Sequence, residues 1–152
     1  MVQAAIALGS NLGDRQAALQ DAVVQLGSHL HGLTVSDFLD TEPEGVGAQP
    51  RFLNAVAVGG WESGARSLLE VLTAIERSAG RERPYPGAPR TLDLDLVLLG
   101  PTVVDEPGLV VPHPRFRERG FVLAPLCQIA PGLVDPVTGR TVAELYRAWL
   151  EQ

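Results

Sequence analysis

The sequence contains no lysine, a single cysteine and no long apolar run. The lone Cys127 excludes an internal disulfide and a zinc site built on cysteine pairs; it lies in the apolar run FVLAPLCQIA, so we expect a packed core thiol. No stretch approaches the roughly 18 consecutive apolar residues of a membrane span, and the opening MVQAAIALGS has no basic segment before its apolar residues. We therefore expect a soluble, cytoplasmic protein.

Two further features limit the partners and the kind of nucleotide site that we expect. The net charge is −6 at pH 7, which argues against nucleic acid or an anionic membrane as the main partner. No G-x-x-x-x-G-K-[ST] motif is present, so any bound ATP is not held by a Walker loop, and the early GSNLG is typical of a tight turn.

Length and composition predict one globular domain over residues 1–152. Of these residues 45% are hydrophobic and 20% are charged, which suffices for a real core. Nothing in the pattern indicates an obligate dimer, so we expect a monomer.

The apolar periodicity predicts alternating strands and helices. We expect strands at 2–8, 33–41, 51–61 and within 90–100, a helix that begins after Asp14 and a second helix at 63–79. This βαββαβ order predicts an α+β, ferredoxin-like antiparallel sheet with both helices on one face and the other face open to ligands. From about 101 onward we expect a C-terminal extension of short strands near 102–104 and 109–114 and helices near 121–130 and 141–150.

The stretch RTLDLDLVLLG, residues 90–100, places two carboxylates on one strand. Alternation turns its leucines to one face and both Asp93 and Asp95 to the other, where like charges repel each other unless water or a cation lies between them. A solvated sheet face would explain the pair. Because no histidine or cysteine is near in sequence, the alternative is a Mg²⁺ site shared with substrate phosphates, and two ions would fit this spacing.

Half of the basic residues form two clusters. Arg81, Arg83 and Arg90 precede or begin the aspartate strand, and three more arginines lie in HPRFRERGF, residues 113–121. One guanidinium group can donate two parallel hydrogen bonds to phosphate oxygens. The clusters therefore suit a small polyanion such as a nucleoside triphosphate. A solvated turn is the alternative for the second cluster.

Four segments together resemble one family. They are ALGSNLGD, FLNAV, GAPRTLDLDLVLLG and VPHPRFRERGFVLAPL, in this order through nearly the whole chain. The sequence is similar to the 6-hydroxymethyl-7,8-dihydropterin pyrophosphokinases of folate biosynthesis. The resemblance implies that the hydroxymethyl oxygen of the reduced pterin attacks the β-phosphorus of ATP and that AMP leaves.

The resemblance also implies roles for individual residues. Asp93 and Asp95 would bind two Mg²⁺ ions, and positioning with charge neutralisation would carry the reaction without a strong general base. The implied phosphate and nucleotide contacts are Arg90, His113 and Arg119, with Arg81 and Arg83 from the preceding loop and Glu76 at the end of the second helix. A helix-end carboxylate such as Glu76 is otherwise expected to be solvated.

For the pterin, the family pattern implies that Phe52 and Phe121 stack on the ring and Asn54 reads its polar edge. The backbone around Thr41, Pro43 and Gly45 would complete this pocket. Core packing of the two phenylalanines is the alternative.

The loop before GAPR departs from the family pattern. Pro86 and Gly87 stand where the family commonly has a basic residue and a large aromatic, and Tyr85 is displaced by two positions. We expect the two prolines of this loop to stiffen it, and Tyr85→Ala to change ATP affinity or turnover if this tyrosine closes on the nucleotide.

Two other functions fit part of the sequence. A ferredoxin-like module that only binds a metabolite would explain the periodicity but not the paired carboxylates beside arginines. A different two-metal enzyme, such as a nucleotidyl transferase or cyclase, would use the aspartates but gives no role to Phe52, Asn54 and Phe121.

Overall fold

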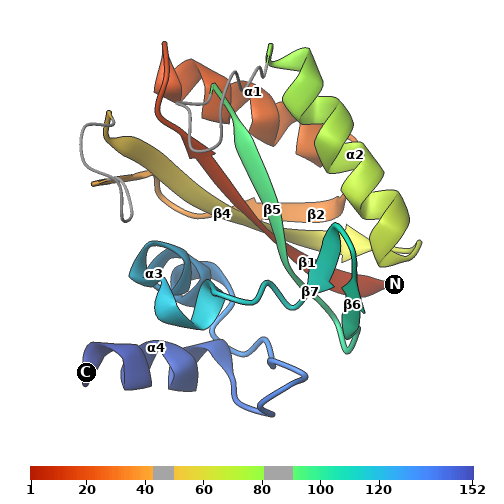
Figure 1. The fold of residues 1–152 in the computed structure, drawn as a ribbon, viewed down its shortest axis with the longest axis vertical. Helices are drawn as coiled ribbons and strands as arrows, with labels where there is room; N and C mark the ends of the chain where they lie inside the picture. Colours follow the sequence, from red (N-terminus) through yellow and green to blue (C-terminus); the bar gives the residue numbers. More distant parts are fainter. Residues whose placement is uncertain (43–49, 81–90) are drawn as a thin grey trace.

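The core of the fold is an antiparallel sheet with helices on both faces (Figure 1). The structure, a computed structural model, describes residues 1–42, 50–80 and 91–152. Along the chain the elements are β1 (Val2–Ser10), α1 (Arg15–Gly27), β2 (His31–Val35), β3 (Leu39–Thr41), β4 (Phe52–Trp61), α2 (Ala65–Ser78), β5 (Asp93–Leu99), β6 (Val104–Glu106), β7 (Leu109–Val111), the 3-10 turn η1 (Phe116–Glu118), α3 (Gly120–Ile129) and α4 (Val142–Leu150).

The strand order confirms the predicted ferredoxin-like topology. The sheet runs β2–β4–β1–β5, β3 also pairs with β4, and β6 and β7 form a separate hairpin. As predicted, Asp14 caps α1, because its carboxylate accepts a hydrogen bond of 3.1 Å from the Ala17 N–H. No helix in the described ranges is long and apolar enough to cross a membrane.

The single strand predicted over 33–41 is wrong, because Ser36 interrupts it. The Ser36 Oγ accepts a hydrogen bond from the Val56 N–H at 2.9 Å and donates one to the Asp37 carbonyl at 2.9 Å. A side chain thus replaces a backbone partner in the ladder, as short hydroxyl side chains can. The result is two short strands, β2 and β3, which pair with different parts of β4.

Both helices of the βαββαβ core cover one face of the sheet. The buried positions of α2 include Leu68, Leu72 and Ile75, spaced four and three residues apart, which places them on one side of the helix. They pack with α1 against alternate strand residues, among them Ala4, Ile6, Leu8, Ala55, Ala57, Leu94 and Leu96.

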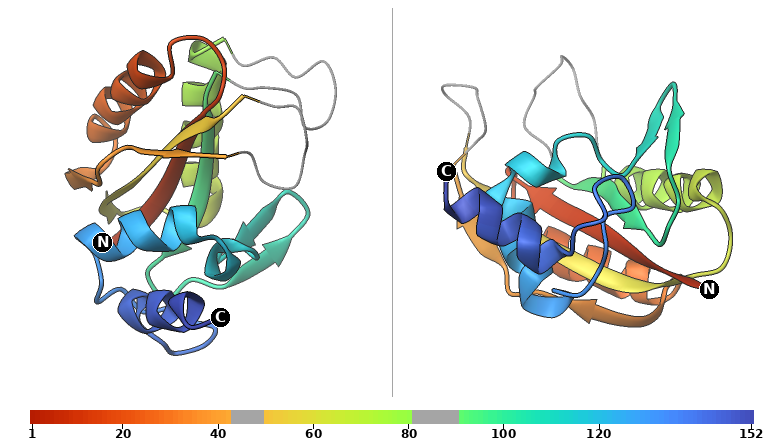
Figure 2. Two further views of the ribbon diagram at one scale, coloured as in Figure 1. Left: turned by 90° about the vertical axis from the view of Figure 1, so that its left-hand side faces the viewer. Right: turned by 90° about the horizontal axis from the view of Figure 1, so that it is seen from below.

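The opposite face is only partly open, which corrects the sequence prediction. One part of it is covered by α3 and α4, so the sheet lies between two helical layers (Figures 1 and 2). This second core contains the following buried residues: Ala5, Val56, Val58, Val97, Leu98, Phe116, Val122, Leu123, Leu126, Val142 and Leu145. Ligands can therefore reach this face only where α3 and α4 leave it uncovered.

An irregularity in β5 connects the extension to the sheet. The register shifts between Ala5 and Ile6, so that Ala5 pairs with Leu98, Ile6 pairs with Leu96, and Val97 is an extra residue. The Val97 carbonyl accepts a hydrogen bond of 2.9 Å from the His113 N–H. The bulge therefore fixes the start of the segment that leads into η1 and α3.

Candidate active site

A cavity lies at the uncovered end of the sheet, beside the first turn of α3. Its lining comes from β1, β3, β4, β5 and α3: Ala7, Leu8, Gly9, Thr41, Glu42, Phe52, Asn54, Ala55, Asp93, Asp95, Arg119, Phe121 and Val122. Segments more than 100 residues apart in sequence therefore meet around one space.

The two aspartates of β5 both line this cavity. Each is half-buried, whereas Leu92, Leu94 and Leu96 are buried in the core under α1 and α2. The predicted division of the strand into a leucine face and a carboxylate face is confirmed. Across the ladder, Asp93 faces Gly9 and Asp95 faces Ala7, two small residues that leave space above the sheet.

Glu76 reaches the same strand from behind, and the expectation of a solvated carboxylate is wrong. The residue is 6% exposed, and its Oε2 accepts a hydrogen bond of 2.7 Å from the Leu94 N–H. Leu94 lies between the two aspartates on the edge strand β5, where outward backbone groups need an acceptor. Glu76 thus fixes the backbone that carries both carboxylates.

Polar and aromatic side chains form the other half of the cavity. The Asn54 side chain is 7% exposed and donates a hydrogen bond of 2.5 Å from Nδ2 to the Thr41 Oγ1. Phe52 and Phe121 are half-buried and line the cavity from β4 and α3. The Arg119 guanidinium lies over the Phe121 ring, 5.6 Å from its centroid, at cation–π distance.

His113 lies outside the cavity lining. It is half-buried, and its Nδ1 accepts a hydrogen bond of 3.1 Å from the Arg115 N–H. In the neutral imidazole the hydrogen then sits on Nε2.

The cavity thus brings together Thr41, Phe52, Asn54, Asp93, Asp95, Arg119 and Phe121 of the predicted site residues. Pro43, Gly45, Arg81, Arg83, Tyr85 and Arg90 lie outside the described residues. Within the described part of the chain, no three metal-ligating side chains gather at one point.

Gly9 is a cavity residue that the sequence interpretation missed, since GSNLG was considered as a turn and, within ALGSNLGD, as part of the family resemblance, without a role for Gly9. A Cβ added here would lie 3.2 Å from the Asn54 Oδ1 and 3.5 Å from the Phe52 Cδ1. A glycine near the end of an apolar strand is the available signal, because such a glycine often marks a close approach of ligand or backbone.

Fold and site together define an α+β protein with a cavity lined by carboxylate, guanidinium, amide and aromatic side chains. Residues 5–131 match the family model of the 7,8-dihydro-6-hydroxymethylpterin-pyrophosphokinases. The chain belongs to the 7,8-dihydro-6-hydroxymethylpterin-pyrophosphokinase family.

Curated relatives agree with this assignment. The chain is 39% identical over 150 residues to the 2-amino-4-hydroxy-6-hydroxymethyldihydropteridine pyrophosphokinase of Bacillus subtilis, with 97% of this chain and 90% of the relative covered. It is 41% identical over 146 residues to the enzyme of that name from Pseudomonas aeruginosa, with 94% and 89% covered.

Longer proteins contain a similar region. The folic acid synthesis protein fol1 of Pneumocystis carinii is 37% identical over 142 residues, which are 93% of this chain and 19% of that protein. Among solved structures, Plasmodium falciparum HPPK-DHPS has a TM-score of 0.78 at 13% identity, with 99% of this chain and 45% of that chain covered. At this identity the likeness supports the fold alone.

Proposed function

We propose that this pyrophosphokinase of folate biosynthesis transfers the pyrophosphoryl group of ATP to the hydroxymethyl oxygen of 6-hydroxymethyl-7,8-dihydropterin and releases AMP. The observation that carries the proposal is the shared cavity, where the two carboxylates of β5 face the aromatic and amide side chains of β4 and α3. A polyanion and a flat heterocycle could be held there side by side.

The heterocycle would bind between Phe52 and Phe121. Offset stacking suits a flat ring, and the two phenylalanines line the cavity from different elements. Because Nδ2 of Asn54 already donates to Thr41, the amide has Oδ1 and its second N–H for the polar edge of the ring. The backbone around Thr41, Pro43 and Gly45 would complete this half of the binding site.

The triphosphate would bind toward β5 and the start of α3. Arg119 lines the cavity and would contact phosphate oxygens, with Arg90 and His113 supplying further donors. We place Arg81 and Arg83 at the nucleotide on the family resemblance, whereas the buried Glu76 would act on the nucleotide site through the β5 backbone that it binds. No side chain is needed as a strong base, because phosphoryl transfer depends mainly on positioning and charge stabilisation.

Asp93 and Asp95 have the hard oxygen donors that Mg²⁺ prefers, so the residues present fit two ions shared with the triphosphate. Two carboxylates leave most coordination positions to phosphate oxygens and water. Bound Mg²⁺ would neutralise charge on the triphosphate. The chain's own part is to hold both carboxylates rigidly, which the Glu76 contact to the Leu94 N–H supports.

The test is AMP release from Mg²⁺-ATP by the purified protein, with and without the reduced pterin, followed by chromatography of the pterin product. We expect pterin-dependent AMP in equal amount to diphosphorylated pterin. Pterin binding without AMP would instead indicate a binding module. AMP without a modified pterin would contradict the proposed acceptor.

We also propose that residues 1–152 act as one catalytic domain, monomeric and cytoplasmic. Size-exclusion chromatography with light scattering would test the monomer. A dimer at working concentrations would contradict it.

A further inference from the structure

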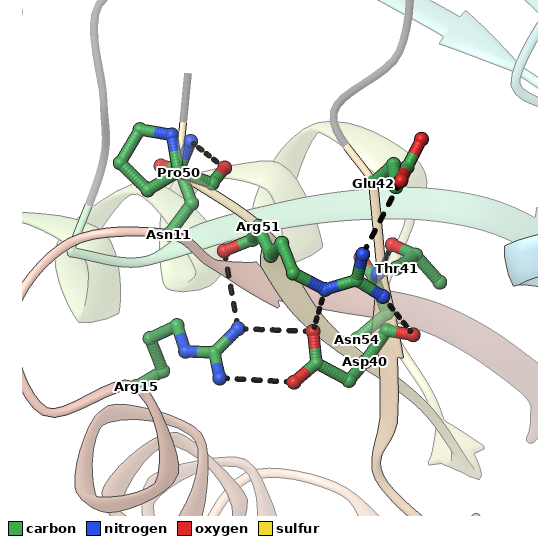
Figure 3. A network of polar contacts seen from close by, with 8 residues as sticks. All are labelled: Asn11, Arg15, Asp40, Thr41, Glu42, Pro50, Arg51 and Asn54. Carbon is green, nitrogen blue, oxygen red and sulfur yellow. Dashed lines mark hydrogen bonds and ion pairs between the residues drawn. The ribbon is translucent and has the colours of Figure 1, made fainter. Parts of the chain in front are cut away.

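One carboxylate outside the cavity joins three elements (Figure 3). The Arg15 guanidinium, on the first residue of α1, contacts both oxygens of Asp40 at 3.3 and 3.1 Å. The Arg51 Nε donates to the same carboxylate at 3.0 Å. Asp40 thus links α1, β3 and the residue before β4.

Backbone carbonyls take part in the same network. Arg15 Nη1 also donates to the Arg51 carbonyl at 3.1 Å, and Arg51 Nη2 donates to the Asp40 carbonyl at 3.3 Å. Each arginine therefore binds the Asp40 carboxylate and also one main-chain carbonyl, that of Arg51 for Arg15 and that of Asp40 for Arg51. Such paired guanidinium contacts fix direction as well as distance.

This network lies behind the heterocycle half of the cavity. Neighbouring side chains of a strand point to opposite faces, so Asp40 points away from the cavity that Thr41 lines. Along the ladder Thr41 faces Phe52 and Leu39 faces Asn54. Any slip of β3 would therefore displace Thr41 relative to the two residues beside it.

Apolar burial does little to hold β3 in place. The strand has only three residues, it pairs with β4, and Leu39 is 39% exposed. The Asp40 contacts add polar support on its other face, beside the Arg51–Glu42 ion pair of 3.5 Å that follows the strand. The neighbouring arginines, through their hydrogen bonds, hold the pKa of Asp40 below its usual value, while the Asp40 carboxylate raises the pKa of Arg15. Both shifts favour the charged forms of Asp40 and Arg15.

We propose that Asp40, Arg15 and Arg51 are positioning residues for the heterocycle. They hold β3 against β4 so that Thr41, Phe52 and Asn54 keep the arrangement that receives the ring. The inference rests on the proposed function, since it names the residues that set the shape of that binding site. None of the three lines the cavity, so they act through the residues that do.

The first variant is Asp40→Asn, which keeps the shape and removes the charge. We expect the Kd and the KM for the reduced pterin to rise about tenfold, with the KM for ATP and kcat within about twofold, because a slightly displaced site loses affinity for the group it orients. The melting temperature should change little, since exposed ion pairs contribute little stability.

The matched control is Glu106→Gln. Glu106 forms an exposed ion pair of 2.8 Å with Arg66, and neither residue lines the cavity. Asp40→Glu, which retains the charge, should recover part of the pterin affinity. In a double-mutant cycle with Arg51→Gln, the losses should be less than additive.

Fluorescence titration of the pterin without ATP separates this inference from the proposed function. If the wild-type protein binds no pterin and releases no pterin-dependent AMP from Mg²⁺-ATP, the proposed function fails. If it binds, and Asp40→Asn leaves the pterin Kd unchanged, the positioning inference is overturned. Equal losses for pterin and ATP, or the same loss in Glu106→Gln, would overturn it as well.

Discussion

The two faces of the sheet use the same strands for different purposes. The face under α1 and α2 is mainly apolar, whereas the other face is apolar beneath α3 and α4 and polar at the cavity. Strand β5 contributes to all three regions: leucines to the first core, Asp93 and Asp95 to the cavity, and Val97 with Leu98 to the second core. Strand alternation separates site from core, and the bulge at Val97 turns the strand end toward the second helical layer.

Asp95→Asn should produce the largest effect, and it should be confined to activity. Loss of a carboxylate that would hold Mg²⁺ beside the triphosphate is expected to lower kcat/KM by about 10³-fold, or about 4 kcal/mol of barrier. The cavity face is not core, so the free energy of unfolding should stay within about 0.5 kcal/mol. Steady-state kinetics and urea unfolding measure the two quantities.

Asp105→Asn is the control for this prediction, because Asp105 is exposed on β6, outside the cavity. It should keep wild-type turnover. An active Asp95→Asn protein would contradict the assignment of this carboxylate to the reaction.

Leu96→Ala, one residue further along, should have the opposite profile. Leu96 is 6% exposed in the core under α1 and α2, so truncation should cost about 3 kcal/mol of unfolding free energy. The cavity lining is untouched, and folded protein should keep its kcat within about threefold. Denaturant unfolding with assays below the transition measures both.

Leu150→Ala provides the comparison, since Leu150 is 58% exposed. This substitution should lower the free energy of unfolding by less than about 1 kcal/mol. If Leu96→Ala lost activity and kept stability, the separation of the two faces would be wrong.

Much of this arrangement was predictable from local pattern. Period-two alternation predicted the leucine and carboxylate faces of β5, and 3.6-residue periodicity predicted α1 and α2. The break at Ser36 was not predictable, because it depends on the N–H of Val56, 20 residues away. The burial of Glu76 likewise depends on a backbone donor 18 residues away.

The cover on the second face lay equally beyond local pattern. The sequence predicts helices near 121–130 and 141–150, but no periodicity says which part of a sheet they cover. That choice follows from the packing of residues such as Phe116 and Leu123 against Val97 and Leu98. This packing decides which part of the second sheet face stays uncovered and can serve as a binding site.

Substitution of Asp135 should destabilise the second helical layer. This buried carboxylate binds Arg117 at 2.5 and 2.9 Å and also accepts from Thr138 and the Val137 N–H. Burial alone would raise the pKa of Asp135, but the hydrogen bonds from Arg117, Thr138 and Val137 outweigh it and hold the pKa below the ordinary 3.8. Asp135→Asn should cost about 2 kcal/mol at pH 7, less than for a fully buried pair because the Arg117 side chain is 26% exposed to water.

The pH dependence follows from the sign of that pKa shift. A carboxyl group whose folded pKa is lowered stabilises the protein above its unfolded pKa, and this contribution disappears as the pH falls through the folded value. The stability difference between wild type and Asp135→Asn should therefore be constant near neutrality and shrink below about pH 4. Urea midpoints at several pH values measure it, with Asp105→Asn as the exposed control; a difference that grew in acid would contradict the assignment.

The smallest expected effect is at Gly9, where the cavity face is tested without removing any functional group. In Gly9→Ala the new methyl group lies 3.2 Å from the Asn54 Oδ1, so the amide or the Phe52 ring must shift by a few tenths of an ångström. We expect the pterin KM to rise about fivefold, or about 1 kcal/mol, with the ATP KM unchanged. Gly132→Ala is the matched control, because a Cβ there meets nothing within 4 Å. Equal effects of the two variants on the pterin KM would mean that the uncovered end of the sheet does not hold the ring.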